Sequence, residues 1–272
     1  MKYLKLFLLY ICMYLPVSGQ AVSIKSELWG FWLPHNSQSV LTIDNKWYQD
    51  FLSKYVYTNQ EGINLVRYSQ VTPSDKKALE SYLGYLSKIK IAQYNKDEQL
   101  AYWINLYNAL TIYTVLNHMP TTSITKIKLS GFFSIGPWDA KLIKIENKEL
   151  SLNDIEHRII RPIWHDSRTH YALNCASMSC PNIQKTPFNG QKINQMLNEA
   201  AVTYVNSPRA VTIKDHKLIL SSIYNWYDTD FAPNKKGVIA EISKFAYPRL
   251  KQQLVKFNEA DKYEYDWSLN GK

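Results

Sequence analysis

A single long apolar segment, from about Asp97 to His118, constrains the fold of this chain more than any other feature. Its middle reads LAYWINLYNALTIYTVL, which is apolar almost all round when it is wound into a helix. Because such a helix has no polar side to turn toward water, it has to be covered on most sides by the rest of the chain. The sequence therefore predicts a central, buried helix around which the other elements pack.

Two asparagines interrupt this apolar helix. Asn105 and Asn108 are three residues apart and so share one face of the helix. A buried amide costs about 1–3 kcal/mol unless it is hydrogen-bonded, so the pair indicates a polar network. Two interpretations are open: the amides hold a neighbouring loop, or they face a ligand pocket with Tyr107 or Trp103 nearby.

The remaining elements are expected to be helices and hairpins. Apolar spacing and capping residues predict helices over about 44–55, 72–89, 151–160 and 191–205. Pro162 is expected to end the third of these helices. Alternation predicts strands over 63–68 and 170–174, and hairpins within 142–152 and 211–220 that turn at Asn147-Lys148 and Asp215-His216. Helices around antiparallel hairpins, without regular strand–helix alternation, indicate the α+β class.

The first 21 residues have the three-part layout of a secretory signal peptide. Lys2 and Lys5 form a basic start, an apolar run of about ten residues follows, and the small residues Gly19 and Ala21 end the segment. A membrane span needs about 20 apolar residues, so this run is too short for a permanent anchor. We expect export to a bacterial periplasm or to the extracellular space, with no transmembrane segment once the signal is removed.

No linker rich in Gly, Ser or Pro divides residues 22–272. We therefore expect one domain after signal removal. It would comprise an N-terminal extension (22–74) packed on a main α+β domain (75–257), followed by a C-terminal tail (258–272).

The formal net charge is +9, and it falls to +7 without residues 1–21, which hold two lysines and no acidic residue. The basic residues are scattered, which predicts a mildly basic solvated surface; loose attraction to acidic envelope polymers is the alternative. The chain has no nucleic-acid motif. No cofactor is expected, and no metal, because no standard zinc-ligand spacing occurs. The partner is unknown at this point.

The segment HYALNCASMSCP (170–181) holds the densest group of candidate catalytic residues. A thiolate nucleophile needs a base such as histidine and often an orienting amide or carboxylate, and His170, Asn174 and Cys175 supply these types. On a continuous strand, His170 and Cys175 would point to opposite faces, because they are five residues apart. The chain would have to bend near Asn174 to bring them together.

A disulfide is the competing interpretation of the cysteines. Cys175 and Cys180 are the only two outside the predicted signal peptide, and disulfides persist in exported proteins. The bridge would close a loop of about six residues and contribute about 2 kcal/mol through chain entropy. It would also consume both thiols, so an oxidised protein could not be a resting thiol enzyme.

Two further pairs of residues are candidates for a binding site. Glu156 and His157 lie near the end of the helix predicted over 151–160. Glu156 faces a different side of that helix from Arg161, so its partner is expected elsewhere in the fold. Trp226 and Asp230 lie in SSIYNWYDTDF, where Asp230 either supports packing or pairs with a histidine.

Four segments together resemble the signature blocks of the family catalogued as domain of unknown function 547. They read YWINLYNALTI, LSLNDIEHRIIRP, HYALNCASMSCPNI and LSSIYNWYDTDF, and the resemblance covers roughly residues 75–250. It implies no settled activity. It does imply that ten residues occupy the family's signature positions: Asn105, Asn108, Glu156, His157, His170, Asn174, Cys175, Cys180, Trp226 and Asp230.

A more distant similarity is to the papain/transglutaminase-like fold, in which a nucleophile caps a buried central helix and a His and an Asp follow on strands. This chain departs from that pattern, because Asn105 lies well inside the corresponding helix and no cysteine precedes it there. The similarity therefore concerns the fold and does not extend to that triad.

Two functions follow from these residues. The preferred one is a ligand-binding or scaffolding module that has a Cys175–Cys180 disulfide and a polar pocket lined by Asn105, Asn108, Glu156, His157, Trp226 and Asp230. The alternative is a thiol-dependent amide or peptide hydrolase or transferase, with Cys175 as nucleophile, His170 as base and Asn174 as orienter. Binding is preferred because a disulfide is the simpler use of two neighbouring cysteines outside the cytoplasm.

Overall fold

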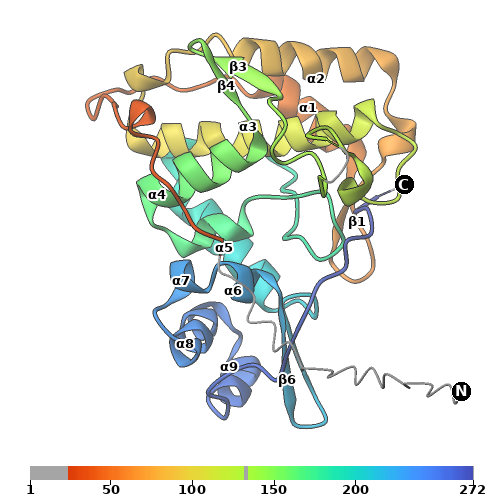
Figure 1. Ribbon diagram of the computed structural model, residues 1–272, viewed down its shortest axis with the longest axis vertical. Coiled ribbons are helices and arrows are strands. Elements are labelled where there is room, and N and C mark those ends of the chain that lie inside the picture. Colours follow the sequence, from red (N-terminus) through yellow and green to blue (C-terminus); the bar gives the residue numbers. More distant parts are fainter. Residues whose placement is uncertain (1–23, 132–133, 272) are drawn as a thin grey trace, which may run out of the picture.

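The computed structural model describes residues 24–131 and 134–271, and helix α3 (Lys96–Asn117) runs through the upper half of the molecule (Figure 1). The predicted signal peptide, residues 1–21, lies outside the described residues. Asn95 caps α3, because its side chain accepts a hydrogen bond from the Glu98 N–H at 2.9 Å. Nearly every side chain from Glu98 to Leu116 is buried, which agrees with the central helix that the sequence predicts.

The other described elements are short. The remaining α-helices are α1 (Lys46–Tyr55), α2 (Pro73–Leu86), α4 (Arg161–Trp164), α5 (Ile193–Val205), α6 (Ile223–Trp226), α7 (Asp228–Phe231), α8 (Lys235–Phe245) and α9 (Pro248–Leu254). The strands are β1 (Val56–Thr58), β2 (Asn64–Val66), β3 (Ile143–Ile145), β4 (Lys148–Leu150), β5 (Val211–Lys214), β6 (Lys217–Ser221) and β7 (Lys262–Glu264). A π-helix, η5 (Asp154–Ile160), leads directly into α4. Short 3₁₀ turns span Gly30–Trp32, Tyr68–Gln70, Ile91–Gln93, Ile124–Lys126, Ser167–Tyr171 and Gly190–Lys192.

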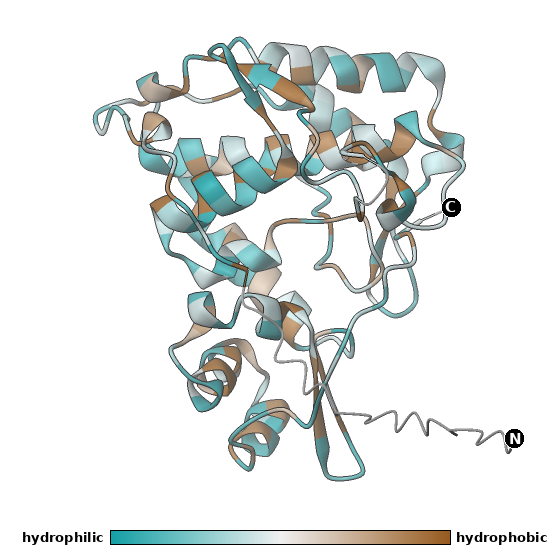
Figure 2. Cartoon of the chain, in the orientation of Figure 1, coloured by the Kyte–Doolittle hydropathy of each residue, from teal (hydrophilic) through white to brown (hydrophobic). Residues whose placement is uncertain are grey.

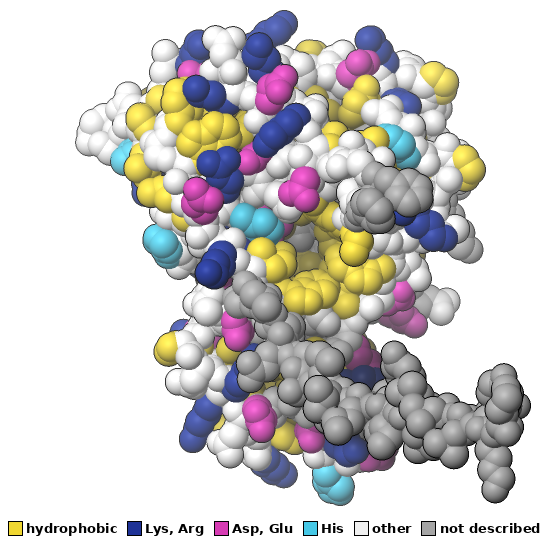
Figure 3. Space-filling view, viewed as in Figure 1, with side chains coloured by type: hydrophobic (Ala, Val, Ile, Leu, Met, Phe, Trp, Pro, Cys, Tyr) yellow, Lys and Arg dark blue, Asp and Glu magenta, His cyan; other side chains and the backbone are white. Residues whose placement is uncertain are grey.

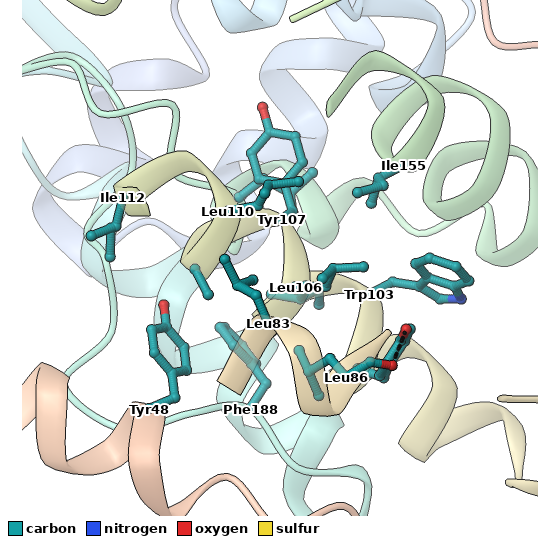
Figure 4. Packing of buried hydrophobic residues seen from close by; sticks show 14 of the residues in the cluster. Tyr48, Leu83, Leu86, Trp103, Leu106, Tyr107, Leu110, Ile112, Ile155 and Phe188 are labelled. Carbon is teal, nitrogen blue, oxygen red and sulfur yellow. Dashed lines mark hydrogen bonds between the residues drawn. The ribbon is translucent and has the colours of Figure 1, made fainter. Parts of the chain in front are cut away.

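The larger hydrophobic core surrounds α3 (Figure 4). Leu83 and Leu86 of α2 pack on one side of the helix, beside Trp103. Ile155 of η5 and Phe188, from the loop before α5, pack around the same helix. The helix is therefore enclosed by elements from both earlier and later parts of the chain.

Helix α3 carries polar residues into this core, and its ribbon in Figure 2 shows teal segments beside brown ones. Asn105 exchanges two hydrogen bonds with the Phe188 backbone, at 2.8 and 2.9 Å. The Asn108 amide donates to the Ala172 carbonyl at 2.9 Å, and its oxygen accepts from the Asn174 N–H at 2.8 Å. The predicted polar network is present, and both amides hold loops against the helix.

A smaller core lies below α3, where the end of α5, the β5–β6 hairpin and helices α6 to α9 meet (Figure 1). Tyr204, Leu220 and Tyr224 are buried there. Strands β5 and β6 are antiparallel and turn at Asp215 and His216, both with positive φ, as predicted. Strand β7 extends this sheet by pairing in parallel with β6.

The other two sheets are hairpins of two strands each. Strands β1 and β2 pair antiparallel, as do β3 and β4. The β3–β4 turn places Glu146 and Asn147 at positive φ, one residue earlier than predicted. Helices packed around small, mostly antiparallel sheets confirm the α+β class.

Two local predictions are wrong. Residues 170–174 do not form a strand, because Asp166 caps a 3₁₀ turn over Ser167–Tyr171 by accepting the Arg168 N–H at 2.9 Å. Pro162 does not end the helix that begins near Asp154. It lies inside a helix that runs without a break from η5 into α4 and ends at Trp164, where His165 adopts a left-handed conformation. In the π-helical turn before it, the Arg161 N–H bonds to the Glu156 carbonyl, which replaces the i→i−4 pattern that a proline would break.

Residues 258–271, predicted to be a tail, pack against distant parts of the fold. Val66 N–H donates to the Asn270 carbonyl at 2.9 Å, and the Tyr68 hydroxyl donates to the Asn270 side chain at 2.9 Å. Leu269 N–H donates to the Thr122 carbonyl at 2.9 Å. At the other end of the described chain, Ile24 N–H donates to the Trp226 carbonyl at 2.8 Å. None of the described helices has both the length and the apolar character that crossing a membrane requires.

Candidate functional site

A pocket of about 330 Å³ lies between α3, η5, the 173–181 loop and the C-terminal segment. Figure 3 shows a hollow near the middle of this face of the molecule, bordered by hydrophobic side chains. Much of the pocket wall is aromatic and comprises Tyr107, Trp138, Trp226, Tyr227, Tyr265 and Trp267. Its polar side chains include Asp139, Asn153, Glu156, His157 and His170. The combination offers apolar contact together with a few convergent polar groups, as small-molecule sites do.

His170 is held in the wall by a carboxylate and an aromatic ring. Its Nε2 lies 2.7 Å from Oδ2 of Asp230, and its ring stacks on Tyr227 with centroids 4.3 Å apart. Of the two interpretations of Asp230, pairing with a histidine is the contact that the structure contains. Because Asp230 occupies Nε2, the other ring nitrogen, Nδ1, faces Glu156 at 4.0 Å.

Arg161 holds the same carboxylate and shares its Oδ2 with His170. Its guanidinium donates to both oxygens of Asp230, at 2.5 and 3.1 Å, and also to the Ile24 carbonyl at 2.8 Å. Burial opposes ionisation of Asp230, but the hydrogen bonds from His170 and Arg161 outweigh it and hold the pKa of that carboxyl well below its usual range. Asp230 is thus a permanent anion that orients His170 at neutral pH.

Glu156 lies within 4.0 Å of two histidines, His157 of η5 and His170 of the 3₁₀ turn over Ser167–Tyr171. Its Oε1 is 3.9 Å from His157 Nδ1 and 4.0 Å from His170 Nδ1. Tyr107 and Tyr227 interact with the same carboxylate through their hydroxyls, and burial, aided by Glu156, raises the pKa of both tyrosines well above its usual range. Both hydroxyls therefore remain protonated and can donate.

His157 is a neutral base in this arrangement. Burial lowers the pKa of His157, and the nearby Arg161 and His170 lower it further against the opposing effect of Glu156. The geometry agrees, because Arg161 lies 3.1 Å from His157 Nδ1 and can only donate to it. The i, i+4 spacing of His157 and Arg161 brings them together across η5, a π-helical turn of a kind that is frequent at functional sites.

Cys175 and Cys180 form a disulfide, with their Cα atoms 6.1 Å apart, which confirms the predicted bridge. Both cysteines also line the pocket. The Tyr265 hydroxyl lies 3.1 Å from the sulfur of Cys175 and 3.2 Å from that of Cys180. The sulfur atoms are therefore part of the wall in their oxidised form.

The three asparagines predicted at the site hold the backbone that builds it. Asn105 and Asn108 fasten loops to α3, as described above, and lie outside the pocket wall. Asn174 donates to the Pro181 carbonyl at 2.7 Å and accepts from the Ala176 N–H at 3.0 Å. It therefore braces the disulfide loop from within.

The structure thus gathers Glu156, His157, His170, Trp226 and both cysteines around one pocket, with Asp230 behind His170. All of these residues lie in the segments that resemble the signature blocks of the family. Residues 91–205 match the family described as Protein of unknown function, DUF547. The predicted resemblance is therefore confirmed over that range.

The DUF547 match includes every predicted signature position from Asn105 to Cys180, and it ends before Trp226 and Asp230. No curated protein and no solved structure matches the chain. The similarity to the papain/transglutaminase-like fold therefore stays an expectation. Among residues 24–131 and 134–271, no group of three or more His, Cys, Asp and Glu side chains is placed to hold a metal ion.

Several pocket residues were missed from the sequence, and the three aromatic ones named here lie outside the DUF547 match. Tyr227 follows Trp226 directly, and Tyr265 and Trp267 come from the segment predicted to be a tail. A signal for the last two was present, because Tyr263, Tyr265 and Trp267 alternate along KYEYDW as residues on one face of an extended segment do.

Proposed function

We propose that this protein is an exported ligand-binding module whose pocket is the one built around Glu156 and His170. The observation that carries the proposal is the Cys175–Cys180 disulfide in the pocket wall. Because both sulfurs are consumed, the oxidised pocket presents aromatic rings, imidazoles and a carboxylate, and these groups suit binding. A disulfide also suits an exported protein, since thiols stay reduced in most cytoplasms.

Thiol labelling of the native protein tests this proposal. Alkylation without reductant, followed by mass spectrometry, should leave Cys175 and Cys180 unlabelled, and both should label after reduction and unfolding. Rapid labelling of Cys175 alone in the unreduced protein at neutral pH would contradict the binding proposal. The assay is also run on two variants, His170→Ala and its matched control His35→Ala. His35 is exposed and lies outside the pocket wall.

One observation favours a second candidate, a thiol-dependent amide or peptide hydrolase or transferase that is active when reduced. Cys175 and His170 line the same pocket, and Asp230 orients the imidazole. A reduced Cys175 would then have a histidine base in the same cavity, and a nearby histidine is one way to lower the pKa of a thiol. If His170→Ala slows labelling of reduced Cys175 and His35→Ala does not, this candidate replaces the first.

Export has its own test. The basic start, short apolar run and small-residue end of residues 1–21 predict a mature N-terminus at or near Val22. N-terminal sequencing of protein recovered from the cell envelope or medium should begin at or near Val22. Recovery of intact Met1 from a cytosolic fraction would contradict export.

A further inference from the structure

In the described part of the chain, the buried carboxylate of Glu156 has no ion pair with a lysine or an arginine. Its side chain is 9% exposed and lines the pocket. Within the described parts of the chain, its ion-pair partners are His157 and His170, at 3.9 and 4.0 Å. Neither distance is a direct hydrogen bond. A carboxylate taken out of water at this depth is costly unless a cation compensates it.

Arg161, which follows Glu156 on the same helix, does not pair with it. Its guanidinium is committed to Asp230 through two hydrogen bonds and lies over the Tyr227 ring at 4.8 Å. His157 is neutral for the reasons given above. His170 directs its Nε2 to Asp230 at 2.7 Å, and its Nδ1 lies 4.0 Å from Glu156, which is beyond a direct hydrogen bond. Tyr107 and Tyr227 contribute hydroxyl dipoles to the carboxylate and no charge. Asp139 adds a second acidic group to the pocket wall.

The rest of the wall is a connected set of aromatic rings. Trp226 and Trp267 stack with centroids 5.6 Å apart, and Tyr265 contacts both, at 4.8 and 4.6 Å. Trp138 meets Trp267 edge-on at 5.5 Å. Trp138, Tyr265 and Trp267 are half-buried, so each keeps some exposed surface, and all three line the pocket. Aromatic faces attract cations electrostatically, tryptophan most strongly, and several rings together form the usual cage for alkylated ammonium groups.

We infer that this pocket binds an alkylated ammonium group, with the Trp138–Trp226–Tyr265–Trp267 wall around the cation and Glu156 as its counter-ion. The inference rests on the proposed binding function and names its ligand class. A volume of about 330 Å³ suits a small head group and falls at the lower end of ligand pockets. The head group could belong to a free small molecule or to the end of a larger one.

The test compares a cation with its neutral isostere on the oxidised full-length protein. Choline and 3,3-dimethylbutan-1-ol have nearly the same shape and differ by the positive charge. Calorimetric titration should show saturable choline binding that is about tenfold or more tighter than binding of the alcohol. Phosphocholine and acetylcholine are titrated in the same series. Tighter binding of either than of choline indicates a head group attached to a larger molecule, and tighter binding of choline indicates the free head group.

Two variants locate the effect. Glu156→Gln should weaken choline binding about tenfold and leave the neutral alcohol unchanged, while Glu149→Gln, an exposed acid on β4, should change neither. Trp267→Leu should weaken choline binding as well, and it keeps the test decisive if Glu156→Gln does not fold.

Equal affinity for choline and the alcohol, or choline binding that is indifferent to both Glu156→Gln and Trp267→Leu, would overturn the cation inference. In that case the proposed binding function would still stand, because thiol labelling tests it separately. Absence of saturable choline binding to the folded, oxidised protein would overturn the inference too.

Discussion

Replacing Arg161 with methionine should lower the free energy of unfolding by about 3–5 kcal/mol, which is the usual cost of removing one partner from a buried ion pair. The Arg161 side chain is 2% exposed and donates to Asp230, His157 and the Ile24 carbonyl. Methionine fills part of the same space but leaves these acceptors without their donor. Chemical denaturation of the oxidised protein measures the loss.

The matched control is Arg249→Met on α9. Arg249 is exposed, and changes at such surface positions are usually within about 0.5 kcal/mol. A loss below about 1 kcal/mol for Arg161→Met would show that solvent or His170 compensates Asp230 without the guanidinium, and would contradict our account of this cluster.

The same cluster should make stability depend on pH in the acid range. Because the pKa of Asp230 is held below its unfolded value of about 3.9, the carboxylate stabilises the fold fully above that value. The stabilisation is lost as pH falls below about 4 toward the folded pKa. The difference in stability between the wild type and Asp230→Asn should therefore be largest near neutral pH and shrink in acid.

Gly190→Ala and Gly84→Ala should change stability in opposite directions although the chemical change is the same. A Cβ on Gly190 would lie 2.6 Å from the backbone nitrogen of Glu98 and 2.8 Å from its Cα, at the start of α3. Gly190 also donates its N–H to the Glu98 carboxylate at 2.8 Å. Since the backbone of a capped helix cannot yield easily, the alanine should cost about 1–3 kcal/mol.

Gly84 lies inside α2, and a Cβ there would meet nothing within 4 Å. Alanine at this position should therefore stabilise the protein by about 0.4–1 kcal/mol, because it restricts the unfolded chain and favours the helix. Thermal unfolding of the two variants side by side is the measurement. Two shifts of the same sign would contradict the tight packing of Gly190 against α3.

Local patterns were enough to predict much of the framework. The central helix was predicted from its almost continuous apolar composition. The hydrogen-bond network was predicted because Asn105 and Asn108 are amides that a buried helix shields from water. The disulfide follows from two neighbouring cysteines. Each of these inferences needs only residues that are near one another in the sequence.

The assembly of the site depends on contacts that no local pattern records. His170 and Asp230 are sixty residues apart, and their pairing was one of two open interpretations. The π-helical turn at η5 that brings His157 to Arg161 has the same apolar spacing as an ordinary helix. The alternating pattern of residues 170–174 predicted a strand, but the Asp166 cap and the burial of Tyr171 favour a 3₁₀ turn over Ser167–Tyr171.

The packing of residues 262–271 has a consequence for when the pocket can exist. Asn270 bonds to Val66, Tyr68 and Asn174, and Tyr265 and Trp267 complete the wall beside the disulfide. Ile24 contributes to the same wall from the opposite end of the described chain. The wall of the cavity is therefore incomplete until the last residues of the chain have been synthesised, and a chain that stops short of Tyr265 would lack two of the aromatic rings that line it.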